Sequence, residues 1–89
     1  MAWRVEFHKA AEKEFAKLDP QVRGRILRFL ADRLEGCSDP RAIGEALKGE
    51  VLGRYWKYRV GDWRVICNLQ DEIVLVLVVR TGNRREVYR

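Results

Sequence analysis

The residues best suited to chemistry are cations and phenols in the second half of the chain: Tyr55, Lys57, Arg59, Arg64, Arg84, Arg85 and Tyr88. Arginine stays protonated and binds phosphate oxygens through two parallel hydrogen bonds, whereas lysine can take part in proton transfer. A tyrosine ring can stack on a nucleobase. Together these side-chain types suit the binding of an RNA phosphate and chemistry on it.

The charge distribution points to the same half. The chain has 89 residues and a formal net charge of +5. Residues 1–53 hold ten Lys or Arg against nine Asp or Glu, whereas residues 54–89 hold eight against four, a surplus of +4. An anionic partner should therefore be attracted to the second half.

Composition excludes several classes of protein. Hydrophobic residues make up 47% and charged residues 35%, which is typical of one globular domain over 1–89. The longest apolar run has seven residues, Ile73–Val79, which is too short to span a membrane. Charged residues near the start argue against a secretory signal. Cys37 and Cys67 form no disulfide framework, so we expect reduced thiols in a cytoplasmic protein.

Histidine and cysteine are too few for two common kinds of site. His8 is the only histidine, which excludes a two-histidine ribonuclease mechanism. Two cysteines and one histidine at these spacings form no convincing zinc site, and we expect no metal or other cofactor. We interpret His8, at a junction between two elements, and both cysteines as mainly structural.

The first third of the chain should form a strand and two helices. Alternation from Trp3 to Phe7 predicts a half-buried strand, and helical spacing follows from Lys9 to Leu18. Asp19-Pro20 separates this helix from a second one that runs to about Glu35, with Gly36 just past its end. Such a short connection makes the two helices an antiparallel hairpin.

The remainder should form strands. We interpret residues 37–53 as a connection with a short helical turn after Asp39. Two alternating runs from Arg54 to Leu69 flank Gly61-Asp62, a good two-residue hairpin turn. Ile73–Val79 reads as a central strand covered on both faces, and the tail from Thr81 is polar and basic. The order β-α-α-β-β-β predicts an α+β fold, with both helices on one face of a mostly antiparallel sheet of four or five strands.

The hairpin turn sets a register that separates the side chains into two faces. The expected core face carries Trp56, Tyr58, Val60, Trp63, Val65 and Cys67. The expected open face carries Tyr55, Lys57, Arg59, Arg64, Ile66 and Asn68. On the open face the register sets Arg59 directly opposite Arg64, with Lys57 diagonal to them, and no acid in the hairpin relieves the repulsion.

Like charges in this position cost stability, so the arrangement suggests a site for an anion. A solvated basic surface without function is the alternative. The same choice applies to Arg23, Arg25 and Arg28 of the second helix, which either contact RNA phosphates or are solvated.

Three segments carry a resemblance to a known family. Leu47-Lys48-Gly49, the run from Tyr55 to Ile66 that includes YRVGDWRVI, and the string GNRREVY from Gly82 to Tyr88 resemble the RelE branch of the RelE/ParE toxin superfamily. With the early helix pair, the resemblance covers nearly the whole chain.

The resemblance implies the toxin of a type II toxin–antitoxin pair. Members of the RelE branch enter the ribosomal A site and cut mRNA there without a metal, using the ribose 2′-OH as nucleophile. The implied partners are the ribosome, mRNA and an acidic antitoxin that folds on contact and forms a hetero-oligomer with the toxin. Two alternatives stay open: a ParE-type protein that poisons DNA gyrase through protein contacts, and a degenerate member that only binds its antitoxin.

The resemblance also implies roles for individual residues. Lys57 matches a lysine that the family uses, and Arg64 matches its phosphate-binding arginine. Arg59 stands where some members have a second lysine; because arginine stays protonated, we expect it to stabilise the phosphate, and the identity of the general base stays open. Either Arg84 or Arg85 matches a second phosphate-binding arginine. Tyr88 matches a tyrosine that stacks on a base or orients the 2′-OH, and Tyr55 and Arg85 are further candidates for RNA binding.

Overall fold

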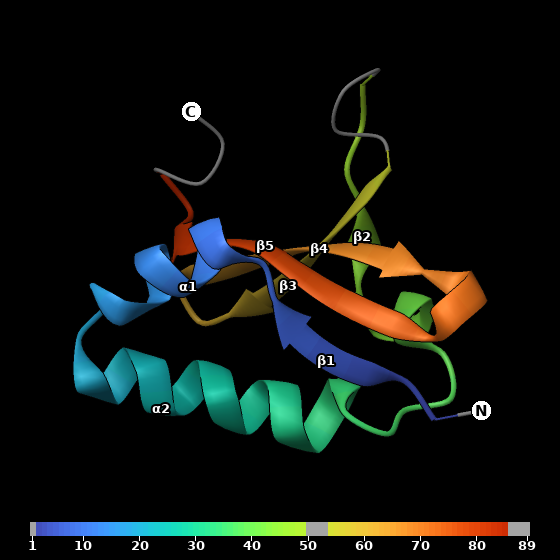
Figure 1. The fold of residues 1–89 in the computed structure, drawn as a ribbon. Helices are drawn as coiled ribbons and strands as arrows, with labels where there is room; N and C mark the ends of the chain where they lie inside the picture. Colours follow the sequence, from blue (N-terminus) through green and yellow to red (C-terminus); the bar gives the residue numbers. More distant parts are fainter. Residues whose placement is uncertain (1, 50–53, 86–89) are drawn as a thin grey trace.

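The computed structural model describes residues 2–49 and 54–85, which form two helices and a five-stranded mixed sheet (Figure 1). The sheet order is β1-β5-β4-β3-β2. β1 (Arg4–Phe7) pairs in parallel with β5 (Leu75–Asn83), and the other neighbours are antiparallel. The predicted α+β class and the two-helix arrangement are confirmed, and the sheet has five strands.

Side-chain caps fix where both helices begin. The N–H of Ala10 donates to Nδ1 of His8 at 3.2 Å, just before α1 (Lys9–Ala16). The N–H of Gln21 donates to Asp19 Oδ1 at 2.9 Å before α2 (Pro20–Phe29), where Pro20 takes the first helical position as predicted. α1 ends two residues earlier than the spacing indicates. The structure thus gives His8 a capping role.

The second helix changes its hydrogen bonding before it ends. Leu30–Leu34 continues α2 as a π-helical turn, in which the N–H of Glu35 donates to the carbonyl of Leu30 at 2.7 Å. Gly36 follows with φ of 78°, a left-handed conformation that glycine adopts at little cost. The predicted end near Glu35 and Gly36 is confirmed.

A short strand lies in the segment interpreted as a connection. A 3-10 turn, Pro40–Ile43, follows the Asp39 cap as expected, and β2 (Glu45–Ala46) then pairs with β3 (Tyr55–Val60). The described part of the chain therefore has one strand more than the order β-α-α-β-β-β, within the expected sheet of four or five strands. Two residues are too few to produce an alternating pattern, so this pairing leaves no local signal in the sequence.

The apolar run near the end is a strand with different bounds. Asp71–Ile73 forms a 3-10 turn and Val74 adopts a positive φ of 54°, so β5 begins at Leu75. Pairing with β4 (Trp63–Gln70) carries β5 on to Asn83, through residues assigned to the tail. The prediction that this strand is covered on both faces is wrong in part. Val76 and Val78 on one face are fully buried, whereas Leu77 and Val79 are only half-buried.

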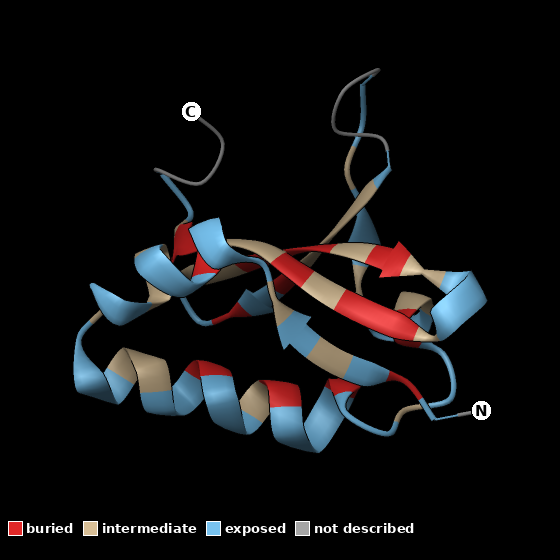
Figure 2. Ribbon diagram, in the orientation of Figure 1, coloured by how far each residue is buried: buried red, intermediate tan, exposed pale blue. Residues whose placement is uncertain are grey.

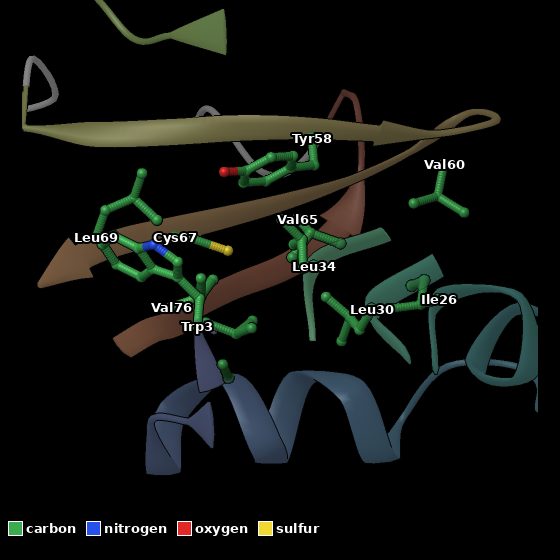
Figure 3. Close-up of a cluster of buried hydrophobic side chains, with 12 residues drawn as sticks. Trp3, Ile26, Leu30, Leu34, Tyr58, Val60, Val65, Cys67, Leu69 and Val76 are labelled. Carbon is green, nitrogen blue, oxygen red and sulfur yellow. The ribbon is translucent and has the colours of Figure 1, made fainter. Parts of the chain in front are cut away.

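One hydrophobic core lies between the helices and the sheet. The side of α2 that faces this core is buried, whereas its outer side is exposed (Figure 2). Tyr58, Val65 and Cys67 point into the same cluster as residues of α2 (Figure 3). Burial raises the pKa of the Tyr58 hydroxyl and of the Cys67 thiol, so both stay neutral. The expected packing role of Cys67 fits this position.

No helix in the described residues is both long enough and apolar enough to cross a membrane.

Candidate nucleic-acid interface

The β3–β4 hairpin has the register that the sequence predicts. Gly61 takes a positive φ of 63° in the turn, and Arg59 pairs with Arg64 while Lys57 pairs with Ile66. Tyr58 and Val65 on the opposite face are buried in the core. We call the face that carries Tyr55, Lys57, Arg59, Arg64, Ile66 and Asn68 the open face.

An acid that the sequence analysis missed lies among these cations. Glu45 of β2 pairs with Lys57 in the sheet, and its two carboxylate oxygens lie 3.5 Å from Lys57 Nζ and 3.5 Å from Arg59 Nη2. The carboxylate offsets part of the repulsion between the cations. The expectation that no acid within the hairpin relieves them holds, and the acid that does so comes from the edge strand β2.

Arg64 projects toward the end of the hairpin. Its Nη1 donates to the carbonyl of Gly61 at 2.8 Å and to that of Trp63 at 2.9 Å. A guanidinium has five N–H donors, and within the described part of the chain these bonds occupy Nη1 only. The Nε and Nη2 donors can therefore bind an anion beside the turn. The structure thus brings Lys57 and Arg59 to one carboxylate and places the Arg64 head at the turn.

The terminal basic residues begin next to the same turn. The N–H of Arg84 donates to the carbonyl of Asp62 at 3.0 Å, which joins the end of β5 to the hairpin turn. The N–H of Arg85 donates to Asn83 Oδ1 at 3.0 Å, and both arginines are exposed. Tyr88 lies outside the described residues, so its expected role stays a prediction.

A second missed residue, Arg80, extends the cationic row across the sheet. Ile66 of β4 pairs with Lys57 on one side and with Arg80 of β5 on the other. Arg80 is held to α1 by Glu14, whose Oε2 lies 3.0 Å from Nη2. A register shift between Ile66 and Cys67 precedes this pairing, so the hairpin register could not be extended to β5 from the sequence.

The helical arginines have different surroundings. Arg23 Nη1 donates to the carbonyls of Ala16 and Leu18, at 3.2 and 2.8 Å, and so fastens the helix–helix connection. Arg25 and Arg28 border a hollow of about 260 Å³ beside Val60, on the helix side of the hairpin. These contacts make Arg23 structural and leave the other two facing solvent.

Among residues 2–49 and 54–85, no three His, Cys, Asp or Glu side chains lie close enough together to hold a metal ion. The described side chains of the open face offer ammonium, guanidinium, phenol and amide groups, and Glu45 adds a carboxylate. Such a surface can bind a phosphate, stabilise added charge on it and exchange protons with nearby hydroxyls.

Comparison with known proteins yields a family match over almost the whole chain. Residues 5–88 match the family described as the ParE toxin of the type II toxin–antitoxin system parDE. The mRNA interferase toxin RelE of Escherichia coli strain K12 is 33% identical over 90 residues, which cover 99% of this chain and 92% of that toxin. Toxin RelG of Mycobacterium tuberculosis is 27% identical over 89 residues, which cover 100% of this chain and 99% of that toxin.

Solved structures agree with this match. The toxin–antitoxin complex RelBE2 of Mycobacterium tuberculosis contains a chain with a TM-score of 0.83 and 25% identity, with 94% of this chain and 100% of that chain covered. The two-helix, five-stranded arrangement is thus shared with a solved toxin.

Proposed function

Because the chain belongs to the RelE/ParE family of type II toxin–antitoxin toxins and is RelE-like, we propose that it is a ribosome-dependent endoribonuclease that cleaves mRNA in the ribosomal A site. Its place of action would be the cytoplasm. The observation that carries this proposal is the set of cations on the open face, with Lys57 and Arg59 beside one carboxylate and Arg64 and Arg84 beside the hairpin turn.

The proposed reaction is an internal transfer at phosphorus. The 2′-oxygen of one ribose attacks the adjacent phosphorus as its proton leaves to a base, and the bond from phosphorus to the 5′-oxygen of the next nucleotide breaks. That oxygen takes up a proton. The products are a 2′,3′-cyclic phosphate and a 5′-hydroxyl, and no water, metal or redox partner is consumed.

The cations have distinct parts in this proposal. Arg59, Arg64 and Arg84 or Arg85 bind the phosphate and stabilise the extra negative charge of the pentacovalent state, which guanidinium groups suit through their fixed donor geometry. Lys57 is the candidate for proton transfer at the 2′-OH. Tyr88 is proposed to stack on a base or orient that hydroxyl. Tyr55 and Arg85 are proposed to bind the RNA strand.

A translating extract tests the proposal. Primer extension on a reporter mRNA should show new 3′ ends inside codons when the protein is added, and the same RNA without ribosomes should stay largely intact. Intact mRNA in a translating extract at high protein concentration would contradict the proposal.

Arg59→Ala and Arg4→Ala make a matched pair for this assay. The two arginine side chains are 61% and 58% exposed, and each lies near one glutamate, at 3.5 and 3.7 Å. Arg59→Ala should reduce cleavage by about 100-fold, the usual cost of removing one group that stabilises transition-state charge. Arg4→Ala, on the far edge strand, should cleave like the wild type.

The match to a family described as the ParE toxin supports a second candidate, the ParE-type inhibitor of DNA gyrase that the resemblance left open. A supercoiling assay with the same protein would then show inhibition and trapped cleavage complexes. If the protein neither cleaves mRNA nor inhibits gyrase, binds its antitoxin tightly and causes no growth arrest, it is a degenerate member that acts only as a binding module.

We also propose an acidic antitoxin segment as the partner in a hetero-oligomer. A similar toxin was solved in a toxin–antitoxin complex, and the surplus of +4 over residues 54–89 complements an acidic peptide. Dissociation of the complex should accelerate as salt rises, because screening weakens attraction between exposed charges. Salt-independent dissociation would contradict a charge-based interface.

A further inference from the structure

The open face is hollowed at the end opposite the hairpin turn. The hollow has a volume of about 400 Å³, and its lining includes Arg54, Tyr55, Asn68, Gln70, Leu77 and Val79. Arg54 lies just before β3, and the others come from the start of β3, the end of β4 and the middle of β5. His8 and Ala10 at the start of α1 complete the lining of the hollow. We call it the Tyr55 hollow.

Sheet register places the Tyr55 hollow next to the cationic row. Asn68 pairs with Tyr55 on one side and with Leu77 on the other, and the row formed by Lys57, Ile66 and Arg80 lies next along the strands. Tyr55 and Lys57 are two positions apart, which is about 7 Å along a strand. A nucleic-acid strand with a phosphate at the cations would therefore carry a neighbouring nucleotide over the hollow.

The lining has the groups that bind a single base. The phenol ring of Tyr55 is half-buried and can stack on a base, and Leu77 and Val79 add an apolar floor. The Asn68 and Gln70 amides each carry donors and an acceptor, which match the edges of unpaired bases. Within the described residues, no side-chain hydrogen bond engages the Tyr55 hydroxyl or either amide. Arg54 at the rim adds a positive charge for the backbone.

A bulged pairing explains why the floor is apolar there. Cys67 pairs with Val78 while Ile66 pairs with Arg80, so Val79 is the extra residue between them. Val79 therefore lines the open face in addition to Leu77. The half-buried Leu77 and Val79 thus lie where polar hydrogen-bonding groups converge, as in sites for small planar ligands.

We propose that the Tyr55 hollow is a nucleobase subsite that receives the base of the mRNA nucleotide next to the scissile link. Tyr55 stacks on this base, and Asn68 and Gln70 read its edge. The hollow thereby sets which codons are cut. This inference rests on the proposed function and adds to it the residues that determine specificity.

The test is the distribution of cut sites over a reporter mRNA that contains every sense codon. Asn68→Leu should change the relative cleavage at the four bases of one codon position by about tenfold, the discrimination expected from one lost base contact. Tyr55→Ala should lower cleavage about tenfold at all codons because stacking accepts any base, and Tyr55→Phe should restore it. Gln21→Ala, on the exposed side of α2, is the control and should match the wild type.

The outcomes separate this inference from the proposed function. If the wild type cleaves on ribosomes but Asn68→Leu and Gln70→Leu both keep its cut-site distribution, the subsite is wrong while the nuclease stands. If Tyr55→Phe fails as completely as Tyr55→Ala, the ring does not act by stacking. If the wild type cuts no mRNA, the proposed function fails first. Circular dichroism of each variant excludes an effect of misfolding.

Discussion

The two faces of the β3–β4 hairpin use the same strands in opposite ways. On the core face, Tyr58, Val65 and Cys67 are at most 1% exposed and pack against the helices. On the open face, the side chains of Arg59 and Lys57 are 61% and 19% exposed and share a carboxylate. Alternation along a strand thus lets a small domain pack its core with one set of residues and present cations with the next.

Ile66 is an exception to this division into a buried face and an exposed face. It points to the open face, between Lys57 and Arg80 in register, yet is only 4% exposed. An apolar residue at this place supports the long side chains beside it, which can cover apolar surface with their methylene stems while their charged ends reach solvent. The open face is therefore a packed platform and more than a solvated surface.

The largest contrast should come from two adjacent residues. Arg64→Ala should reduce mRNA cleavage by about 100-fold or more, while Val65→Ala should leave cleavage unchanged. Conversely, Val65→Ala should lower the free energy of unfolding by about 2 kcal/mol through a cavity in the core. Arg64→Ala should lower it by only about 1 kcal/mol, because the half-buried side chain loses two hydrogen bonds to backbone carbonyls but leaves no cavity in the core. Primer extension and urea denaturation measure the two effects. Loss of the folded signal in Arg64→Ala would mean that the faces are misassigned.

Tyr58→Phe should give the next largest effect, and on stability only. The Tyr58 hydroxyl donates to the carbonyl of Pro40 at 2.7 Å inside the core. Removing it leaves a buried carbonyl without that donor, at a cost of about 1–2 kcal/mol. Denaturant titration should show the loss, with unchanged cleavage per folded molecule. A fall in cleavage beyond the unfolded fraction would show that the core hydrogen bond also positions the open face.

Features that depend on neighbouring residues could be predicted from the sequence, and features that depend on distant residues could not. The Gly61-Asp62 turn and the alternation around it are local, and they predicted the β3–β4 register and both faces correctly. Glu45 and Arg80 were missed because their positions depend on a two-residue edge strand and on a register shift, neither of which has a local pattern. The two early helices were found through Asp19-Pro20, whereas no local pattern in the sequence indicated the π-helical turn. The roles of the site residues, Tyr88 among them, remain predictions from resemblance.

Glu45→Gln sharpens the comparison on the open face itself. Because the carboxylate faces both Lys57 and Arg59, it would compete for them with the phosphate of the proposed substrate. The variant should bind a short single-stranded RNA with a 2′-deoxy scissile link severalfold more tightly at low salt, and the gain should vanish near 1 M salt, where screening acts within about 3 Å. Fluorescence anisotropy measures both affinities.

Glu6→Gln is the matched control for this variant. The side chains of Glu6 and Glu45 are 56% and 55% exposed, and Glu6 lies beside Arg4 on the far edge strand. Its RNA affinity should equal that of the wild type. If Glu45→Gln loses cleavage while its affinity is unchanged, the carboxylate takes part in the reaction and competition is the wrong explanation.

The smallest effect concerns a salt bridge away from the open-face cations. Arg41 donates to both oxygens of Asp71, at 2.9 and 2.8 Å, and this hydrogen bonding lowers the pKa of the Asp71 carboxyl. Because the folded-state pKa lies below the unfolded value of about 3.9, the pair stabilises the fold above that pH and loses its effect as the pH falls through the folded pKa. Asp71→Asn should therefore lower the urea midpoint slightly at neutral pH, and its difference from the wild type should disappear in acid.

Asp32→Asn, at an exposed aspartate, is the control. A difference that persists at low pH would mean that Asp71 stabilises the turn by packing, and RNA cleavage should be unchanged in both variants.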